Sequence, residues 1–117
     1  MSTYVHWLIE LKVAKDQAAA FKALADEAVA ATKQEPGCMG YDWNLADDGE
    51  TVHIYECFKD SAAVLAHMEN FGKFRERFRA MITPVSFTIY GSPNTEVRAA
   101  FAGRDVRYFN SIAGFIR

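Results

Sequence analysis

The sequence has little of what several specialised protein classes need. Its 117 residues include only two cysteines and three prolines, and its formal net charge is −2. A charge this close to zero gives no basic surface for nucleic acid or an anionic membrane, so we expect neither partner. Cys38 and Cys57 have no Cys-x-x-Cys spacing, so neither a zinc site nor a disulfide framework is indicated. Two small buried side chains are the simpler interpretation.

The chain also has no long apolar run. A membrane-spanning helix needs about 20 consecutive apolar residues. The N-terminus shows no basic segment leading to an apolar stretch and a cleavage site. We therefore expect a cytoplasmic protein. The length predicts one domain, and a hydrophobic content of 50% is enough for a core without covalent cross-links.

Apolar residues alternate with polar ones in four segments, which predicts four strands. In the first, Val5, Trp7 and Ile9 share one face. In the last, Val85, Phe87 and Ile89 lie on one side. The turn at 47–49 joins the second and third segments into a predicted hairpin. The predicted strands cover residues 4–13, 39–45, 51–59 and 83–90.

Helical spacing of apolar residues predicts two main helices. The first covers residues 17–34, with Asp16 as its N-cap, and the second begins after Asp60 or Ser61 and breaks at Gly72. A third, short helix is expected in the C-terminal segment, because Ser92-Pro93 suits a helix start and Gly103 a helix end.

The order of these segments is β-α-β-β-α-β, the arrangement of ferredoxin-like α+β folds. It predicts a four-stranded antiparallel sheet with helices on one face, a core over about residues 3–91, and a helical extension over 92–117. We expect the extension to dock over a cavity entrance or across a partner. The strand residues Trp7, Ile9 and Phe87, together with Trp43, provide more apolar surface than two helices should cover, which predicts a homodimer.

One run of residues connects this fold to a known family. Glu35-Pro36-Gly37-Cys38 ends a helix sharply, because Pro36 cannot continue it, and leads into a strand. A later strand contains Tyr55-Glu56, and the helix after it contains Ala66-His67. In this order and spacing the chain resembles the antibiotic biosynthesis monooxygenase family of small α+β proteins over about residues 3–91.

The resemblance implies a dimeric α+β barrel in which two sheets meet face to face and each monomer's pocket lies between its own sheet and helices. It also implies a monooxygenase that needs no cofactor and oxidises a small phenolic, quinol or anthrone-like compound with molecular oxygen. An isomerase on the same fold and a non-enzymatic protein that binds a hydrophobic metabolite are the alternatives.

No strong catalytic motif is present. The sequence has no P-loop, no Gly-x-Gly-x-x-Gly opening a helix, no Gly-x-Ser-x-Gly and no His-Glu-x-x-His. His6, His53 and His67 come from different segments, so their spacing does not indicate that they share a metal. We therefore expect no metal site.

His67 is the main catalytic candidate, because its spacing places it on the helix face that looks toward the sheet. A half-buried imidazole would be biased toward its neutral form and could take a proton from a phenol or enol. The alternative is a histidine at the rim of the core. Glu56 is expected to be a structural hydrogen-bond acceptor or an interface charge.

Several other residues are candidates for the pocket. We expect aromatic side chains to form walls for a flat ligand, and Asn44 or His53 to donate a hydrogen bond to a carbonyl or to reduced oxygen. Arg75, Arg77 and Arg79 recur at every second position, which spreads them around a helix and predicts a solvated face. The expected wall residues are Tyr41, Trp43, Tyr55 and Phe71.

Overall fold

A computed structural model describes residues 3–117 and contains one five-stranded sheet with the order β2-β3-β1-β4-β5. The first four strands pair antiparallel, as expected, whereas the fifth pairs parallel to β4 and makes the sheet mixed. The sequence did not predict this short fifth strand. The strands are β1 (Val5–Val13), β2 (Cys38–Leu45), β3 (Thr51–Phe58), β4 (Ile82–Gly91) and β5 (Arg107–Phe109).

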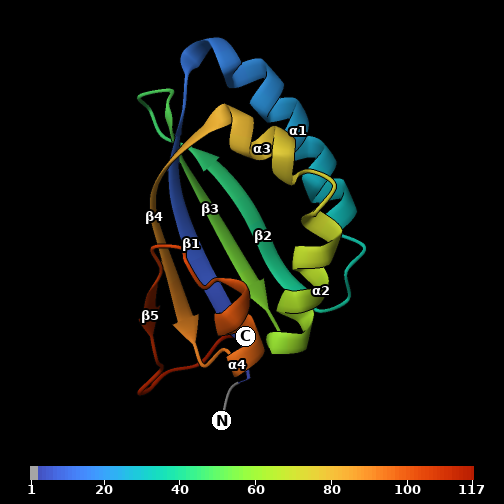
Figure 1. The fold of residues 1–117 in the computed structure, drawn as a ribbon, viewed down its shortest axis with the longest axis vertical. Helices are drawn as coiled ribbons and strands as arrows, with labels where there is room; N and C mark the ends of the chain where they lie inside the picture. The colour runs from blue at the N-terminus through green and yellow to red at the C-terminus, as the bar shows by residue number, and fades with distance from the viewer. Residues whose placement is uncertain (1–2) are drawn as a thin grey trace.

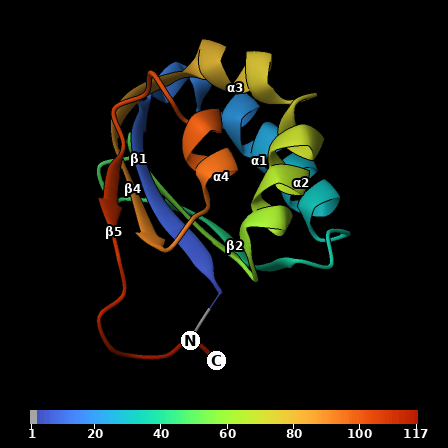
Figure 2. The ribbon, with the colours of Figure 1, turned by 60° about the horizontal axis from the view of Figure 1, so that its bottom comes forward.

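The helices all lie on one face of the sheet and leave the other face open (Figures 1 and 2). The expected break at Gly72 is present, and it divides the second helical region into α2 and α3. No helix within residues 3–117 is long and apolar enough to cross a membrane. The helices are η1 (Lys15–Gln17, a 3-10 helix), α1 (Ala18–Thr32), α2 (Ser61–Phe71), α3 (Arg75–Met81) and α4 (Thr95–Ala100).

Two of the helix starts differ from those expected. Asp60 caps α2 as predicted, accepting a hydrogen bond of 2.8 Å from the Ala63 backbone N–H. Asp16, in contrast, lies inside the 3-10 helix η1 and caps nothing. The C-terminal helix begins at Thr95, where Asn94 is the N-cap, and not at Ser92-Pro93.

The core lies between the helices and the sheet face that they cover. Trp7, Ile9 and Phe87 are part of it, and Trp43 packs against Phe21 from the same side. These are the four side chains from which the sequence predicted more apolar surface than the helices could cover. That expectation is wrong for them, because the two-residue alternation of the strands points them all toward the helices.

A bulge in β4 changes the direction of one expected core residue. Along β1 the pairing moves from Glu10 opposite Ser86 to Leu11 opposite Pro84, so Val85 is an extra residue without a partner. Its side chain is 49% exposed. The expected common face of Val85, Phe87 and Ile89 therefore holds only for the last two.

The C-terminal extension docks through its first half. Val97 is fully buried and Phe101 is 4% exposed, and both pack in the cluster that contains Trp7. Ile112 and Phe115, in contrast, are 99% and 76% exposed. Of the apolar tail residues expected to dock, those of α4 are covered by the body of the protein and those at the end of the chain are not.

Candidate functional site

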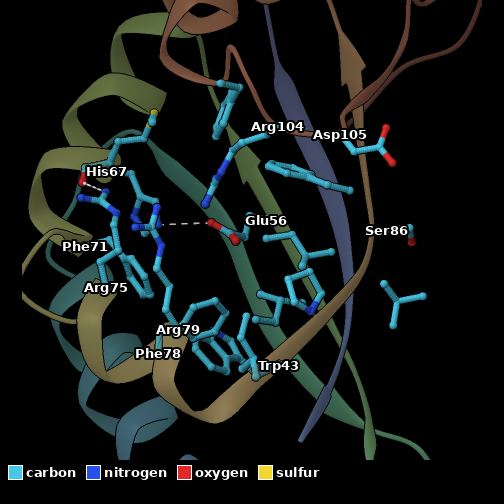
Figure 3. Close-up of a pocket in the computed structure, with 18 of the residues that line it drawn as sticks. Trp43, Glu56, His67, Phe71, Arg75, Phe78, Arg79, Ser86, Arg104 and Asp105 are labelled. Carbon is cyan, nitrogen blue, oxygen red and sulfur yellow. Dashed lines mark hydrogen bonds and ion pairs between the residues drawn. The ribbon is translucent and has the colours of Figure 1, made fainter.

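A cavity of about 570 Å³ lies between the covered face of the sheet and the helices (Figure 3). Side chains of β1, β2, β3 and β4 line one side, and those of α2, α3 and the segment after α4 line the other. Pockets for small organic ligands measure about 300–1,000 Å³. The cavity is therefore large enough for a compound of two or three fused rings.

One wall of the cavity is aromatic. Tyr41 and Trp43 alternate with outward residues along β2, and Phe71 and Phe78 extend from α2 and α3. The ring centroids of Trp43 and Phe78 are 5.8 Å apart, and those of Phe71 and Phe78 are 5.5 Å apart. Because such rings offer flat apolar surfaces, the wall suits an aromatic ligand.

His67 lies at the edge of this wall, between two carboxylates. Its Nδ1 is 3.0 Å from Oε2 of Glu35, which follows α1, and its Nε2 is 3.2 Å from Oε1 of Glu56 on β3. The side chains of His67, Glu35 and Glu56 are 5%, 12% and 6% exposed. Three segments that are distant in the sequence thus form a buried acid–base chain, and Figure 3 shows its link between His67 and Glu56.

This arrangement corrects the expected neutral imidazole. Burial by itself lowers the pKa of His67, but the carboxylates of Glu56 and Glu35 together outweigh it, so that the pKa is raised above its usual value. The folded protein therefore favours the imidazolium form more than water does around a free histidine. In this state His67 has no free lone pair with which to remove a proton from a ligand.

Glu56, and not Glu35, lines the cavity. Asn70 donates a 2.6 Å hydrogen bond to Glu35, which holds that carboxylate behind the imidazole. The Oε1 of Glu56 is buried and faces His67 Nε2 at 3.2 Å, and no donor among residues 3–117 makes a well-oriented hydrogen bond to it. Of the two carboxylates, Glu56 is therefore the one that faces a ligand.

Tyr41 is the other ionisable aromatic residue of the wall. Burial, followed by the negative charge of Glu56, raises the pKa of its phenol far above the usual value. Tyr41 therefore stays protonated and contributes a ring and a hydroxyl group rather than a base. Its ring lies edge-on to the imidazole of His67, with the centroids 5.2 Å apart.

Three candidates from the sequence lie outside the cavity. Strand alternation turns Asn44, His53 and Tyr55 toward the open face of the sheet, away from the helices. His53 Nε2 is 2.7 Å from Oε1 of Glu10, and the Tyr55 hydroxyl is 3.4 Å from His6 Nδ1. The structure thus brings Tyr41, Trp43, His67 and Phe71 to the cavity but not these three.

Three arginines that the sequence did not predict as site residues line the cavity. Arg75 and Arg79 lie on the cavity side of α3, and Arg104 follows α4. Arg77 points away and pairs with Glu27 at 2.7 Å. The four-residue spacing of Arg75 and Arg79 was a usable signal, because residues four apart share a helix face whereas residues two apart do not.

The three histidines do not converge. His67 lies on the covered face of the sheet, whereas His6 and His53 lie on the open face. Within residues 3–117, no group of three or more His, Cys, Asp or Glu side chains is placed to hold a metal ion. The cavity therefore has to be interpreted from its own acidic, basic and aromatic side chains.

Three solved structures illustrate the similarity of this fold to known proteins. MupZ from Pseudomonas fluorescens is 21% identical, with a TM-score of 0.90 over 100% of this chain and 91% of its own. SnoaB from Streptomyces nogalater, a cofactor-independent oxygenase solved as its N63A mutant, is 15% identical, with a TM-score of 0.68 over 80% of this chain and 97% of its own. A conserved Methanosarcina mazei protein is 17% identical, with a TM-score of 0.69 over 75% and 91%.

These similarities show the fold. The match to MupZ covers the whole chain and so includes the C-terminal extension, whereas the other two cover 80% and 75% of the chain. Comparison with curated protein sequences gives no significant match. The family model for antibiotic biosynthesis monooxygenases, however, matches residues 5–83, which is more than half of the chain. The protein therefore belongs to the antibiotic biosynthesis monooxygenase family.

Proposed function

We propose that this protein is a cofactor-independent monooxygenase that oxidises a phenolic, quinol or anthrone-like compound in the cavity. The observation that carries the proposal is the buried pair of Glu56 and His67, 3.2 Å apart, both of which line the aromatic cavity. Family membership and the fold shared with a cofactor-independent oxygenase support it. We assign the role of proton acceptor to Glu56 rather than to His67, because the carboxylates raise the pKa of the imidazole.

The first step is removal of a proton from the substrate by Glu56. Oxygen is a triplet and reacts slowly with neutral closed-shell compounds, whereas an electron-rich phenolate or enolate can pass it one electron. The aromatic wall of Tyr41, Trp43 and Phe71 holds the ring and keeps water away. A carboxylate in hydrogen-bond reach of the acidic proton is the arrangement that general-base catalysis needs.

The second step joins oxygen to the deprotonated carbon. One electron passes from the substrate anion to oxygen, the two radicals combine into a peroxide, and loss of water leaves a carbonyl group. A CH₂ group and O₂ thus become C=O and H₂O, so no external reductant is consumed. The His67 imidazolium, held by Glu35, stabilises negative charge that develops next to it and is a source of the proton for the departing water.

The proposal is tested by oxygen consumption with anthrone and with 1,4-naphthohydroquinone, after subtraction of the reaction in buffer alone. We expect Glu56→Gln to lower the rate by about 10²- to 10⁴-fold, the usual contribution of a general base. Glu10→Gln is the matched control, because Glu10 pairs with a histidine on the open face. Anthrone turnover under ¹⁸O₂ should place the label in the product carbonyl.

The two alternatives give different results in the same assay. An isomerase would convert its substrate without oxygen, so turnover that continues anaerobically would contradict the monooxygenase proposal. A binding protein would hold the aromatic compound without turning it over. Equal oxygen consumption by wild type and Glu56→Gln would remove Glu56 from the mechanism.

We also infer that the protein acts as a homodimer that pairs through the open face of the sheet. This face carries Leu8, Tyr55 and Tyr90, and Tyr90 packs against Phe109 of β5. Tyr55 and Phe109 are 37% and 44% exposed in the single chain. An apolar sheet face without helices is stabilised when a second sheet covers it, and the two identical faces of a symmetric pair are available for this.

A further inference from the structure

The cavity contains more positive charge than the proposed chemistry uses. Arg75 begins α3, Arg79 follows one turn later on the same side, and Arg104 approaches from the segment after α4. In Figure 3 the Arg104 side chain extends into the cavity toward Glu56. Two separate parts of the chain thus place guanidinium groups around one space.

These guanidinium groups have no acidic partner among residues 3–117. None of the three forms an ion pair in this part of the chain, although Arg75 donates a 2.9 Å hydrogen bond to the Met68 carbonyl. Asp105 also lines the cavity, but in Figure 3 its carboxylate points away from the Arg104 guanidinium. Arg77, two residues from Arg79, shows the ordinary alternative of a surface pair with an acidic residue.

The three charges also act on one another. Burial, followed by the positive charges of Arg79 and Arg75, lowers the pKa of Arg104. Like charges brought together at a partly buried place destabilise the protein unless a negative charge joins them. Glu56 does not fill that role, because no ion pair within residues 3–117 joins it to any of the three arginines.

We propose that the cavity binds a substrate that carries an anionic group, a carboxylate or a phosphate ester, which Arg79 and Arg104 hold with help from Arg75. Guanidinium groups bind both anions through paired, charge-assisted hydrogen bonds. The anion fixes one end of the substrate and the aromatic wall holds its ring beside Glu56. This inference rests on the proposed function, since it names the substrate class of that reaction. The experiment that tests it measures binding alone.

This assignment gives the C-terminal extension a role in specificity. Arg104 lies outside residues 5–83, which match the family model, whereas Arg75 and Arg79 lie inside them. Phe101, in the turn after α4, is buried in the core and also lines the cavity. The docked start of the extension therefore places Arg104 at a fixed position over the site.

The test is isothermal titration calorimetry at pH 7 with three probes that share one ring system: 2-naphthoate, 2-naphthyl phosphate and neutral 2-naphthamide. We expect at least one anion to bind about tenfold or more tightly than the amide, the usual effect of a hydrogen-bonded charge. The advantage should shrink as salt is raised, because the cavity is open to screening ions. Whichever anion loses more affinity in Arg104→Gln identifies the group that the site was built for.

Variants locate the effect within the cavity. Arg104→Gln and Arg79→Gln should each remove most of the preference for the anion while leaving the affinity for 2-naphthamide unchanged. Arg77→Gln is the matched control, since it removes an arginine from the same helix without touching the cavity, and should bind like wild type. The comparison of the three probes on the wild type needs no variant, so the test does not depend on the variants folding.

The results separate this inference from the proposed function. Equal binding of the amide and both anions by wild type would overturn the inference, and so would an anion preference that survives Arg104→Gln and Arg79→Gln together. A preference for the anion that persists in Glu56→Gln supports the inference. It would show that the arginines do more than balance the negative charge of Glu56. Oxygen consumption that fails while this preference is present would overturn the monooxygenase proposal alone.

Discussion

On each side of the sheet a strand carboxylate pairs with a histidine, in very different surroundings. On the covered face His67 is 5% exposed and lies 3.0 and 3.2 Å from two glutamates. On the open face His53 is 42% exposed and lies only 2.7 Å from Glu10. The shorter contact is therefore the more exposed one.

The comparison shows that burial, rather than distance, decides what such a pair does. Water and salt weaken an exposed ion pair, whose contribution to stability is usually below about 1 kcal/mol. A buried carboxylate that loses its partner keeps its full desolvation cost. Loss of His67 would therefore leave two buried carboxylates without a partner, whereas His53 and Glu10 can each be hydrated when the other is lost.

The largest expected difference comes from replacing each histidine by leucine. His67→Leu leaves Glu35 and Glu56 buried without a positive partner, and we expect it to lower the free energy of unfolding by about 3–5 kcal/mol. His53→Leu should change it by less than about 1 kcal/mol. Urea unfolding at pH 7 and one fixed protein concentration measures both. Equal losses would show that burial does not separate the two pairs.

A second difference concerns the space around two glycines. A Cβ at Gly37 would lie 2.5 Å from the Ala63 Cβ of α2, whereas one at Gly40 would meet nothing closer than 3.7 Å. Gly37 has no positive φ, so close packing against α2, rather than a turn that only glycine can adopt, is the reason for glycine there. Gly37→Ala should cost about 1–3 kcal/mol, the usual effect of overpacking.

Gly40→Ala is the control for that experiment, since it adds the same methyl group to the same part of the chain. Thermal melting of the two variants compares them directly. A Gly37→Ala protein that melts together with Gly40→Ala would contradict the tight packing of the segment before β2 against α2.

The pH dependence of stability sharpens the comparison further. Because the pKa of His67 is raised in the folded protein, its stabilising effect is complete below about pH 6.5, the usual histidine pKa, and is lost as the pH rises through the raised value. The free energy of unfolding should therefore fall as the pH rises from about 6.5 through the raised pKa. The fall is about 1.4 kcal/mol for each tenfold increase in the proton affinity of the imidazole on folding. His53→Leu should keep this fall and His67→Leu should lack it. Stability of the wild type that increases over the same window would mean that the folded protein keeps His67 neutral.

The smallest expected effect is on assembly. If two open faces pair, Leu8→Glu places a charge in the contact and should weaken dimerisation by about tenfold or more, because burying an unpaired charge is costly. The monomer fold should persist, since Leu8 lies on the side of the sheet without helices. Light scattering over a dilution series measures the change. A wild-type protein that is monomeric at every concentration would contradict the inferred homodimer.

The sequence predicted the covered face better than the extension. The presence of the first four strands, the start of α2 after Asp60 and the break at Gly72 depend on local features, and all three were confirmed. The strand β5 was missed because three residues are too few for a pattern, and it exists only because β4 offers an edge. Val85 was misplaced because a bulge adds one residue without changing the sequence pattern.

For the site, the sequence identified His67 and the aromatic residues Tyr41, Trp43 and Phe71 as candidates. It also named Asn44, His53 and Tyr55, because a segment of alternating residues does not say which of its two faces is covered by helices. Glu35 and Glu56 were visible in the motifs, but their meeting at His67 depends on how a loop, a strand and a helix pack together.

What the sequence determined by itself is the order of the elements and, through periods of two and of about 3.6 residues, which side chains share a face. Only the tertiary structure decided which face is buried and which distant groups meet there. It placed His67 between two carboxylates, which raise the pKa of the imidazole where burial alone would lower it, and it brought Arg104 to Arg75 and Arg79. The physical reason is that the pKa and the pairing of a group depend on the charges and the solvent around it, and these come from segments that are distant in the sequence.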